Sequence, residues 1–464
     1  MSDPVVAPSA LGPGTRASPL AMSPAPGLPD GLLVRTFGGE RDAAGLGRPL
    51  LLARAGAPVT PLLTWIGLTA CHGGVDWVPV EDSGEDDVPY VGDIETIGDL
   101  DPVPSELQRD PKFEGLFDLT HVVEVAVTLS DASLAALALD PRTYTPADVE
   151  IEGEVLTNVG LHFKGSSSFQ NLTGKPSLKL HFNEFVPTQR YGEMNRLTLN
   201  NMVQDPSQAR EILTYWLLNE GGGLAPRASY AHVTINGADY GLYLCLEPMD
   251  HDFLARRFPF PDGDLWEGAN GADLTAVGVA GFELKSGLGD TARLREVATA
   301  VATPSADYYA NADRYVVMDQ ALDFWAWQMV TADIDGYPYH LNDWFMYGDP
   351  GREGRFVLSP WGVDEAWNST FQFQWGQGAL LFNCAADRAC LERVYTHTET
   401  AIAFMENADV PNQLEAFYDL GGAYMESDPR RGWTDADVAF AQSELLEFTR
   451  VWPGQLRAQI EAAR

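Results

Sequence analysis

Acidic side chains lie at both ends of an apolar segment in one stretch of the chain, residues 333–368. Asp333 and Asp335 occupy a short loop with Gly and Pro, and Asp364 and Glu365 follow the second of two expected strands. A hairpin of these strands would bring both acidic pairs near one point. Carboxylate oxygens suit Mg²⁺ or Mn²⁺, and a carboxylate can orient a hydroxyl that accepts a phosphoryl group. The pattern indicates metal-dependent phosphoryl transfer, and turns stabilised by their own Asp side chains are the alternative.

The elements that must position these acids can be predicted from periodicity. Residues 319–332 place apolar side chains at helical spacing, so a helix should lead into the acidic loop. Strands are expected at 344–347 and 355–358, joined by a turn at 349–354. Asn342 precedes the first of these strands, where its amide oxygen could join the carboxylates.

A second candidate site lies in a Gly/Ser-rich loop between two expected strands, within residues 164–182. The backbone N–H groups of such a loop can hold an anion, and the hydroxyls of Ser166 and Ser167 can add donors. Lys175 or Lys179 would then reach the phosphates, and strand alternation places both on one face, so the sequence does not choose between them. An ordinary hairpin loop is the alternative, because neither a Walker loop nor a dinucleotide fingerprint is present.

Charge restricts the class of partner. The chain of 464 residues has a formal net charge of −36, which argues against nucleic-acid binding and against a polybasic membrane anchor. Lysine is rare in this chain, and the residues of this type are Lys112, Lys164, Lys175, Lys179 and Lys285. Three of these lysines fall within residues 164–179, and a compact ammonium binds phosphate differently from planar Arg. We therefore expect no nucleic-acid partner and a phosphate-binding role for this lysine group.

The N-terminal part differs in composition from the rest. Residues 1–58 are rich in Pro, Gly and Ala, which indicates disorder or a wrongly assigned start. A short apolar run then ends in Leu-Thr-Ala-Cys at Cys71, which resembles a bacterial lipobox, and an accidental match is the alternative. Residues 72–113 are acidic and Pro/Gly-rich, as in a flexible linker. We expect an exported lipoprotein of the cell envelope or surface that contacts the membrane only through a lipid anchor on Cys71.

The other cysteines bear on the compartment. Cys384 and Cys390 are close in a polar turn and could form a small disulfide loop in an oxidising compartment, and two free thiols are the alternative. Cys245 lies in an apolar strand pattern and is expected in the core. No Cys/His spacing fits zinc.

The folded domain is expected at residues 114–464, as an α+β fold with antiparallel sheets and a helical C-terminal part from about residue 368. Further strands are expected at 122–129, 150–156, 159–164, 196–200, 230–235 and 240–246. The strongest local signals are a helix start at Asp205, which Pro and Gln follow, and a hairpin turn at Asn236 and Gly237. Glu247 closes the last strand, where a buried Glu would pair with a phosphate-binding lysine and an exposed one would only end the strand.

Seven blocks between about residues 160 and 400 resemble the CotH kinase family and follow its order. They are KGSSSF with KPSLKLHF, LTLNNMVQDPSQAREILTYWL, APRASYAHVTINGADYGLYLCLEPMD, DGDLWEG, FELKSG, DIDGYPYHLNDWFMY and FVLSPWGVDEAW. The resemblance implies an atypical protein-kinase-like fold that binds ATP with Mg²⁺ or Mn²⁺ and phosphorylates serine in a protein substrate.

By position, Asp335 resembles the family's catalytic-loop aspartate, and Asn342 resembles the asparagine that opens its NxYLY-like strand. Asp364 resembles the last aspartate of the PWDxD motif, which would hold the metal. The first aspartate of that motif is Gly362 here. If that acid carries the metal, Asp364 must replace it for activity to remain.

The family's cofactor-binding positions also map onto this chain. Lys175 and Lys179 resemble its paired basic positions, and Glu247 resembles its strand-end glutamate. Lys164 begins the loop where the family pattern RGxSS has Arg.

The sequence thus predicts an exported, lipid-anchored, ATP-dependent protein serine kinase. The alternative is a non-catalytic surface structural or adhesive protein on a kinase-like scaffold, which Gly362 and the acidic composition favour. Calcium sites are a third interpretation, and no twelve-residue loop with the required ligand spacing supports it.

Overall fold

The computed structural model describes residues 32–34, 52–54, 110–373 and 376–464. The chain divides into two compact units, residues 1–86 and 87–464. In the first unit, strands β1 (Leu32–Val34) and β2 (Leu52–Arg54) pair antiparallel, within a range expected to be disordered. The predictions for Cys71 and for nearly all of the linker lie outside the described residues.

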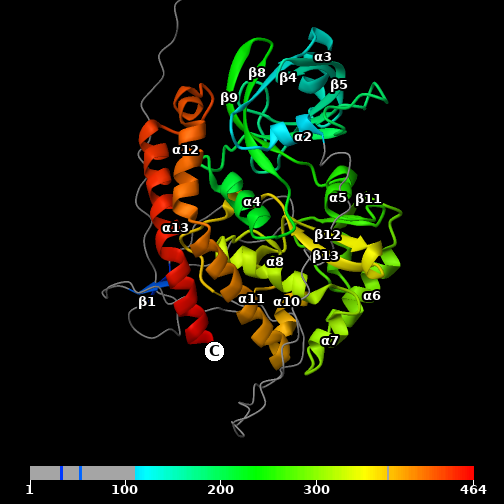
Figure 1. The fold of residues 1–464 in the computed structure, drawn as a ribbon, viewed down its shortest axis with the longest axis vertical. Helices are drawn as coiled ribbons and strands as arrows, with labels where there is room; N and C mark the ends of the chain where they lie inside the picture. Colours follow the sequence, from blue (N-terminus) through cyan, green and yellow to red (C-terminus); the bar gives the residue numbers. More distant parts are fainter. Residues whose placement is uncertain (1–31, 35–51, 55–109, 374–375) are drawn as a thin grey trace, which may run out of the picture. The chain divides into compact units, whose positions relative to one another are not determined.

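Seven strands of the described chain close into a barrel (Figure 1). They are β3 (Val123–Thr128), β4 (Thr145–Ile151), β5 (Glu154–Lys164), β6 (Ser177–His181), β7 (Arg196–Asn200), β8 (Ala228–Ile235) and β9 (Ala238–Leu246). The order around the barrel is β3-β4-β5-β6-β7-β9-β8, and the parallel pair of β3 and β8 closes it. Alternate residues of β3 and β4 are buried, which fills the interior with apolar side chains.

One predicted strand of the barrel is wrong. The prediction placed a single strand at 150–156, but β4 ends at Ile151 and β5 begins at Glu154. The chain turns at Glu152 and Gly153, which have φ of 49° and 80°. Glutamate rarely adopts this left-handed conformation, so the turn signal is weaker than that of Asn236 and Gly237.

Two short helices lie before and after the first barrel strand in the chain, and a longer helix packs against the barrel. Helix α2 (Pro111–Leu116) begins inside the expected linker and buries Phe113, and α3 (Asp131–Leu139) follows β3. Helix α4 (Arg210–Glu220) begins after Asp205, whose carboxylate accepts hydrogen bonds from the backbone N–H groups of Ala209 and Arg210. Helix α4 contacts both β8 and the short 3₁₀ turn η4 (Val363–Glu365), so it connects the barrel with the acidic segment.

A second, four-stranded antiparallel sheet follows the barrel. Its strands are β10 (Leu265–Gly268), β11 (Phe282–Ser286), β12 (Trp344–Asp349) and β13 (Arg355–Pro360), in the order β11-β10-β12-β13. The predicted hairpin is β12 and β13, with Trp344 opposite Pro360. This register places Asp343, just before β12, beside Trp361, just after β13, and the Trp361 N–H donates a 3.0 Å hydrogen bond to the backbone oxygen of Asp343.

Further helices lie in the described part of the second unit. They are α5 (His251–Arg257), α6 (Thr291–Val301), α7 (Tyr308–Ala312), α8 (Met318–Val330), α9 (Tyr337–His340), α10 (Ala379–Phe382), α11 (Arg388–Asn407), α12 (Val410–Ser427) and α13 (Asp435–Ala463). Helix α8 lies beside α11, and α12 lies against β9 and α13 (Figure 1). The chain therefore has the expected α+β character with a helical C-terminal part. Within the part of the chain that the structure describes, none of these helices combines the length and apolar character that crossing a membrane requires.

A buried ionic network joins α8 to α11. His397 lies with its Nδ1 2.6 Å from Asp323 and its Nε2 3.5 Å from Asp319, and Arg393 donates a hydrogen bond to Asp319. Burial lowers the pKa of His397, but its interactions with Asp319 and Asp323 outweigh burial and raise that pKa to about 9. His397 is therefore a buried cation at neutral pH.

The cysteines are placed as the sequence indicates. Cys384 and Cys390 form a disulfide whose Cα atoms are 5.4 Å apart, at the start of α11. Cys245 is a free thiol buried in the barrel.

Candidate functional site

A cleft of about 380 Å³ lies between the barrel and the four-stranded sheet. Five cationic side chains line it, namely Arg142, Lys164, Lys179, Arg196 and Lys285. Aromatic rings of Tyr144, Phe345 and Trp361 also line it, with Asp250 and Glu267 as the acids of the lining. A cationic, partly aromatic cleft in a chain of net charge −36 suits an anionic ligand with a flat ring.

Lys164 connects the cleft to the acidic segment. Its Nζ donates a 2.5 Å hydrogen bond to Asn200, whose amide donates at 3.1 Å to Glu211 on α4. Burial lowers the pKa of Lys164, and the charges of Glu211, Asp364 and Asp343 oppose that shift. Burial, with the charge of Asp364, raises the pKa of Glu211 to about 8. The Lys164 ammonium therefore lies between the other cations of the cleft and several carboxylates.

Lys179 and Lys285 form the second cationic part of the cleft. Burial lowers the pKa of Lys179 to about 8, and the positive charges of Lys164 and Lys285 act in the same direction. Lys285 on β11 is paired with Glu267 at 2.5 Å and with Glu283 at 3.0 Å. No hydrogen bond or ion pair of the Lys179 ammonium appears among the described residues, so this ammonium can bind a ligand oxygen.

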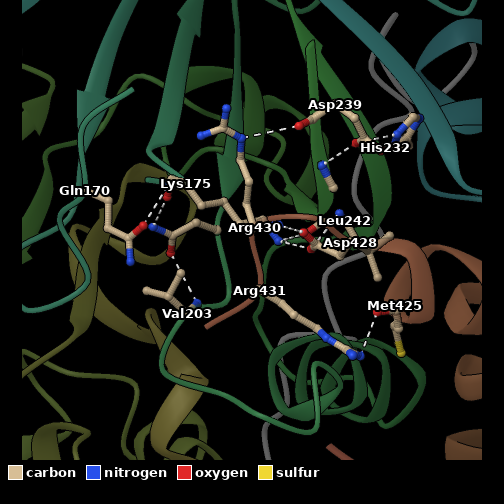
Figure 2. A network of polar contacts seen from close by, with 12 residues as sticks. Gln170, Lys175, Val203, His232, Asp239, Leu242, Met425, Asp428, Arg430 and Arg431 are labelled. Carbon is tan, nitrogen blue, oxygen red and sulfur yellow. Dashed lines mark hydrogen bonds and ion pairs between the residues drawn. The ribbon is translucent and has the colours of Figure 1, made fainter. Parts of the chain in front are cut away.

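Lys175 does not line the cleft. Its side chain is 1% exposed, and its Nζ donates 2.5 Å hydrogen bonds to Asp428, beyond α12, and to the backbone oxygen of Leu242. Figure 2 shows Lys175 pointing toward Asp428 and Leu242. Arg430 completes the contact by donating to the backbone oxygens of Gly174 and Asp239. The structure thus distinguishes the two lysines, which the sequence could not do, because Lys179 lines the cleft and Lys175 does not.

Glu247 is buried but does not pair with a lysine. Its carboxylate accepts hydrogen bonds from Arg256 at 2.6 and 2.8 Å and from the backbone N–H of Arg227. The expected pairing with a phosphate-binding lysine is therefore wrong. Arg256 lies in α5, the helix that follows β9, and the planar arrangement of its guanidinium N–H groups matches the carboxylate of Glu247.

The Gly/Ser loop reaches the cleft through its first residue only. Gly165 lines the cleft with φ of 105°, and the guanidinium of Arg142 donates to its backbone oxygen. A Cβ at Gly165 would lie 2.8 Å from Ser168 Oγ, so a side chain does not fit there. Ser166 is exposed outside the cleft lining, and Ser167 donates to Gln204 at 3.0 Å.

Asp335 is the accessible carboxylate of the acidic segment. Asn342 donates a 3.1 Å hydrogen bond to its Oδ2, and His340 lies 3.4 Å from its Oδ1. Its side chain is 32% exposed, whereas Asp333 is buried and accepts from the backbone N–H of Asp335. Burial, with the charge of Asp335, raises the pKa of Asp333 to about 7. The loop therefore presents the carboxylate of Asp335 outward, where the amide of Asn342 holds it.

Asp364 and Asp343 complete the acidic segment. Asp364 lies in η4, and burial together with Glu365 raises its pKa to about 6 while Lys164 opposes the shift. Burial, with the charges of Asp335 and Asp364, raises the pKa of Asp343 to about 8. The negative charges of Asp335 and Asp364 therefore oppose ionisation of Asp343, and an added cation would favour it.

The donor set fits a hard divalent cation. In the described chain, no three Asp, Glu, His or Cys side chains already converge as a metal cage. Mg²⁺ commonly takes one or two carboxylates and completes its shell with water and substrate phosphates. Asp364 and the side-chain oxygen of Asn342 are ligands of that kind, so the residues fit Mg²⁺ or Mn²⁺ better than a dedicated calcium cage.

Several residues of the site escape prediction from the sequence. Arg142, Arg196, Lys285 and Glu267 come from four separate segments, and no local spacing connects them. Asp343 directly follows Asn342, a predicted metal ligand, and this neighbourhood is the one feature of the sequence that could have indicated Asp343 as part of the site.

Protein-family comparison matches residues 161–438, more than half of the chain, to the family described as CotH kinase protein. The chain belongs to the CotH kinase family. This confirms the resemblance that its sequence blocks indicated, in the region that carries most of the cleft lining and the acidic segment.

Two curated relatives extend the comparison. Inner spore coat protein H of Bacillus subtilis (strain 168) is 28% identical over 197 residues, which cover 39% of this chain and 53% of that protein. Invasin CotH3 of Rhizopus delemar is 24% identical over 310 residues, which cover 60% of this chain and 49% of that protein. The chain thus spans about half the length of the curated relatives it matches.

Proposed function

We propose that this CotH family member is an ATP-dependent protein serine kinase that requires Mg²⁺ or Mn²⁺. The single observation that carries the proposal is the cationic cleft, which adjoins the acidic segment through Lys164. A nucleotide triphosphate needs cations for its phosphates, an apolar surface for its base and oxygen ligands for its metal. The cleft lining, its aromatic rings and the neighbouring acids provide these three.

Each side chain then has a defined task. Lys179 and Lys164 hold phosphate oxygens, and Asn342 fixes Asp335 by donating to its Oδ2. The serine hydroxyl of the substrate donates its proton to Asp335 as its oxygen bonds to the γ-phosphorus, and the bond from that phosphorus to the β–γ bridging oxygen breaks. The divalent cation, held by Asp364 and Asn342, supplies charge neutralisation at the phosphates when it is bound.

The test is phosphotransfer by the full-length protein with ATP and Mn²⁺ or Mg²⁺ on itself and on a serine-rich protein. We expect transfer that falls at least a hundredfold in Asp335→Asn and in Asp364→Asn. Glu353→Gln is the matched control, because it removes one exposed charge from the turn at the other end of the same hairpin. Transfer that survives Asp335→Asn would refute the assigned mechanism.

A second candidate function is that of a surface structural or adhesive protein without catalysis. The printed name of the Rhizopus relative, an invasin, and Gly362 in place of a family aspartate favour it. Thermal unfolding with ATP and Mn²⁺ separates the two. A ligand at a hundred times its dissociation constant stabilises a binding protein by about 2.7 kcal/mol, whereas a scaffold that does not bind ATP gains nothing.

We further propose that the protein is exported and lipid-anchored through Cys71. The Leu-Thr-Ala-Cys sequence and a disulfide between Cys384 and Cys390 support an oxidising destination. Metabolic labelling with palmitate should mark the wild-type protein and not Cys71→Ser. Unlabelled wild-type protein in the soluble fraction would overturn this proposal.

A further inference from the structure

Gly362 leaves a space that the carboxylate of Asp343 occupies. A Cβ built on Gly362 would lie 2.9 Å from both Cγ and Oδ2 of Asp343, closer than real Cβ atoms approach other atoms. The side chains of residues 343 and 362 therefore compete for one position. In this chain the carboxylate at that position comes from the residue before β12, and not from the residue after β13.

The backbone holds Asp343 in this arrangement. Its own backbone oxygen accepts a 3.0 Å hydrogen bond from the N–H of Trp361, which extends the pairing of β12 with β13 by one step. Asp343 has φ of 49° and Gly362 has φ of 56°, so both residues adopt the left-handed conformation. Asp tolerates this conformation better than most residues, and Gly tolerates it freely.

The Asp343 carboxylate is available to contact a ligand. Among the described residues, no hydrogen-bond donor or ion-pair partner contacts its side chain, although it is half-buried. It lies between Asn342, its chain neighbour, and the turn that carries Asp364. The burial of such a carboxylate is offset either by a proton or by a bound cation, and Asn342 and Asp364 place further oxygen ligands for a cation nearby.

We propose that Asp343 is a third oxygen ligand for the divalent cation, with Asp364 and Asn342, and that it replaces the carboxylate missing at Gly362. This inference rests on the proposed function and adds a residue to its metal site. The ligand class is a hard cation, Mg²⁺ or Mn²⁺, completed by phosphate oxygens.

The test is Mn²⁺ binding by the full-length protein, measured as free Mn²⁺ by electron paramagnetic resonance, with and without ATP. We expect Asp343→Asn to raise the dissociation constant for Mn²⁺ at least tenfold. Glu353→Gln, at the distal turn of the same hairpin, should leave it within twofold. Wild-type affinity in Asp343→Asn would overturn the inference.

An exchange of the residues at positions 343 and 362 distinguishes the loss of a metal ligand from misfolding of Asp343→Asn. Gly362→Asp alone should disturb the hairpin, because its side chain would meet Asp343. The double variant Asp343→Gly with Gly362→Asp puts the carboxylate back from the other strand, and it should bind Mn²⁺ within threefold of wild type. A folded double variant that binds Mn²⁺ no better than Asp343→Asn would also overturn the inference.

These outcomes are separate from those of the kinase assay. Mn²⁺ binding that depends on Asp343, without phosphotransfer by wild type, would support the site and refute the kinase. Phosphotransfer by the wild type, with unchanged Mn²⁺ affinity in Asp343→Asn, would support the kinase and refute the site. Wild-type protein that binds no Mn²⁺ at all, even with ATP, would refute the inference whatever the assay shows.

Discussion

Replacement of Lys175 and of Lys179 by methionine should affect two different properties of the protein. Lys175 is 1% exposed and pairs with Asp428, whose side chain is fully buried, at 2.5 Å. Lys179 lines the cleft, and like charges from Lys164 and Lys285 act on it. We expect Lys175→Met to lower the free energy of unfolding and Lys179→Met to weaken ATP binding.

The magnitude for Lys175→Met follows from what remains around Asp428. Removal of one partner from a buried ion pair costs about 3–5 kcal/mol, because the other charge stays buried without compensation. Two backbone donors stay in place, the N–H groups of Leu242 at 3.1 Å and Arg430 at 2.8 Å, and they offset part of this cost. We therefore expect a loss of about 3 kcal/mol for Lys175→Met. For Lys179→Met we expect less than about 1 kcal/mol, because no ion pair is broken.

The assay combines urea unfolding with ATP–Mn²⁺ titration of each folded variant. A double-mutant cycle with Asp428→Asn provides the control, since a neutral side chain at 428 removes the uncompensated charge. The double variant should be more stable than the sum of the two single losses by at least about 2 kcal/mol. Unchanged stability of Lys175→Met would refute the structural role. An equal loss of ATP affinity in folded Lys175→Met and Lys179→Met would refute the separation of the two lysines.

Three further predictions concern stability. The pKa of His397 is raised to about 9 in the folded protein. Its protonated side chain therefore stabilises the fold by on the order of 3 kcal/mol below about pH 6.5, and this stabilisation is lost as the pH rises through 9. In urea unfolding, the free energy of unfolding of wild type should exceed that of His397→Gln at low pH, and the difference should vanish across that range. Reduction of the Cys384–Cys390 disulfide, a short loop, should cost about 2 kcal/mol in thermal unfolding, with no effect of reductant on the double Ser variant. Gly241→Ala should cost about 3 kcal/mol or more, because its Cβ would lie 2.0 Å from a buried carboxylate, whereas Gly237→Ala, with open space at a similar φ, should cost about 1 kcal/mol by the same assay.

Local signals in the sequence predicted much of the scaffold around the site. The Asn236–Gly237 turn, the helix over 319–332 and the hairpin of β12 and β13 each depend on residues close in the chain. Their periodicity and turn chemistry therefore appear in a single window. The same holds for Asp335 and Asn342, which the structure joins by a hydrogen bond across seven positions.

Contacts between distant segments could not be predicted in this way. Lys175 differs from Lys179 only because Asp428, 253 positions further on, reaches it. Glu247 pairs with Arg256 because α5 folds back on the strand end. The role we propose for Asp343 depends on its contact with Gly362, which strand alternation does not reveal.

The ion pair of Lys175 with Asp428 sets an order of events during biosynthesis. The last barrel strand ends at Leu246, and about 180 residues separate it from Asp428. At a synthesis rate of roughly 5–20 residues per second, the ribosome needs on the order of 10–40 seconds to deliver that carboxylate. Throughout this delay the nascent barrel holds a lysine whose counter-ion does not yet exist. The barrel therefore reaches its final stability only when the C-terminal helices arrive, and a truncated chain would expose an unfinished barrel to quality-control proteases.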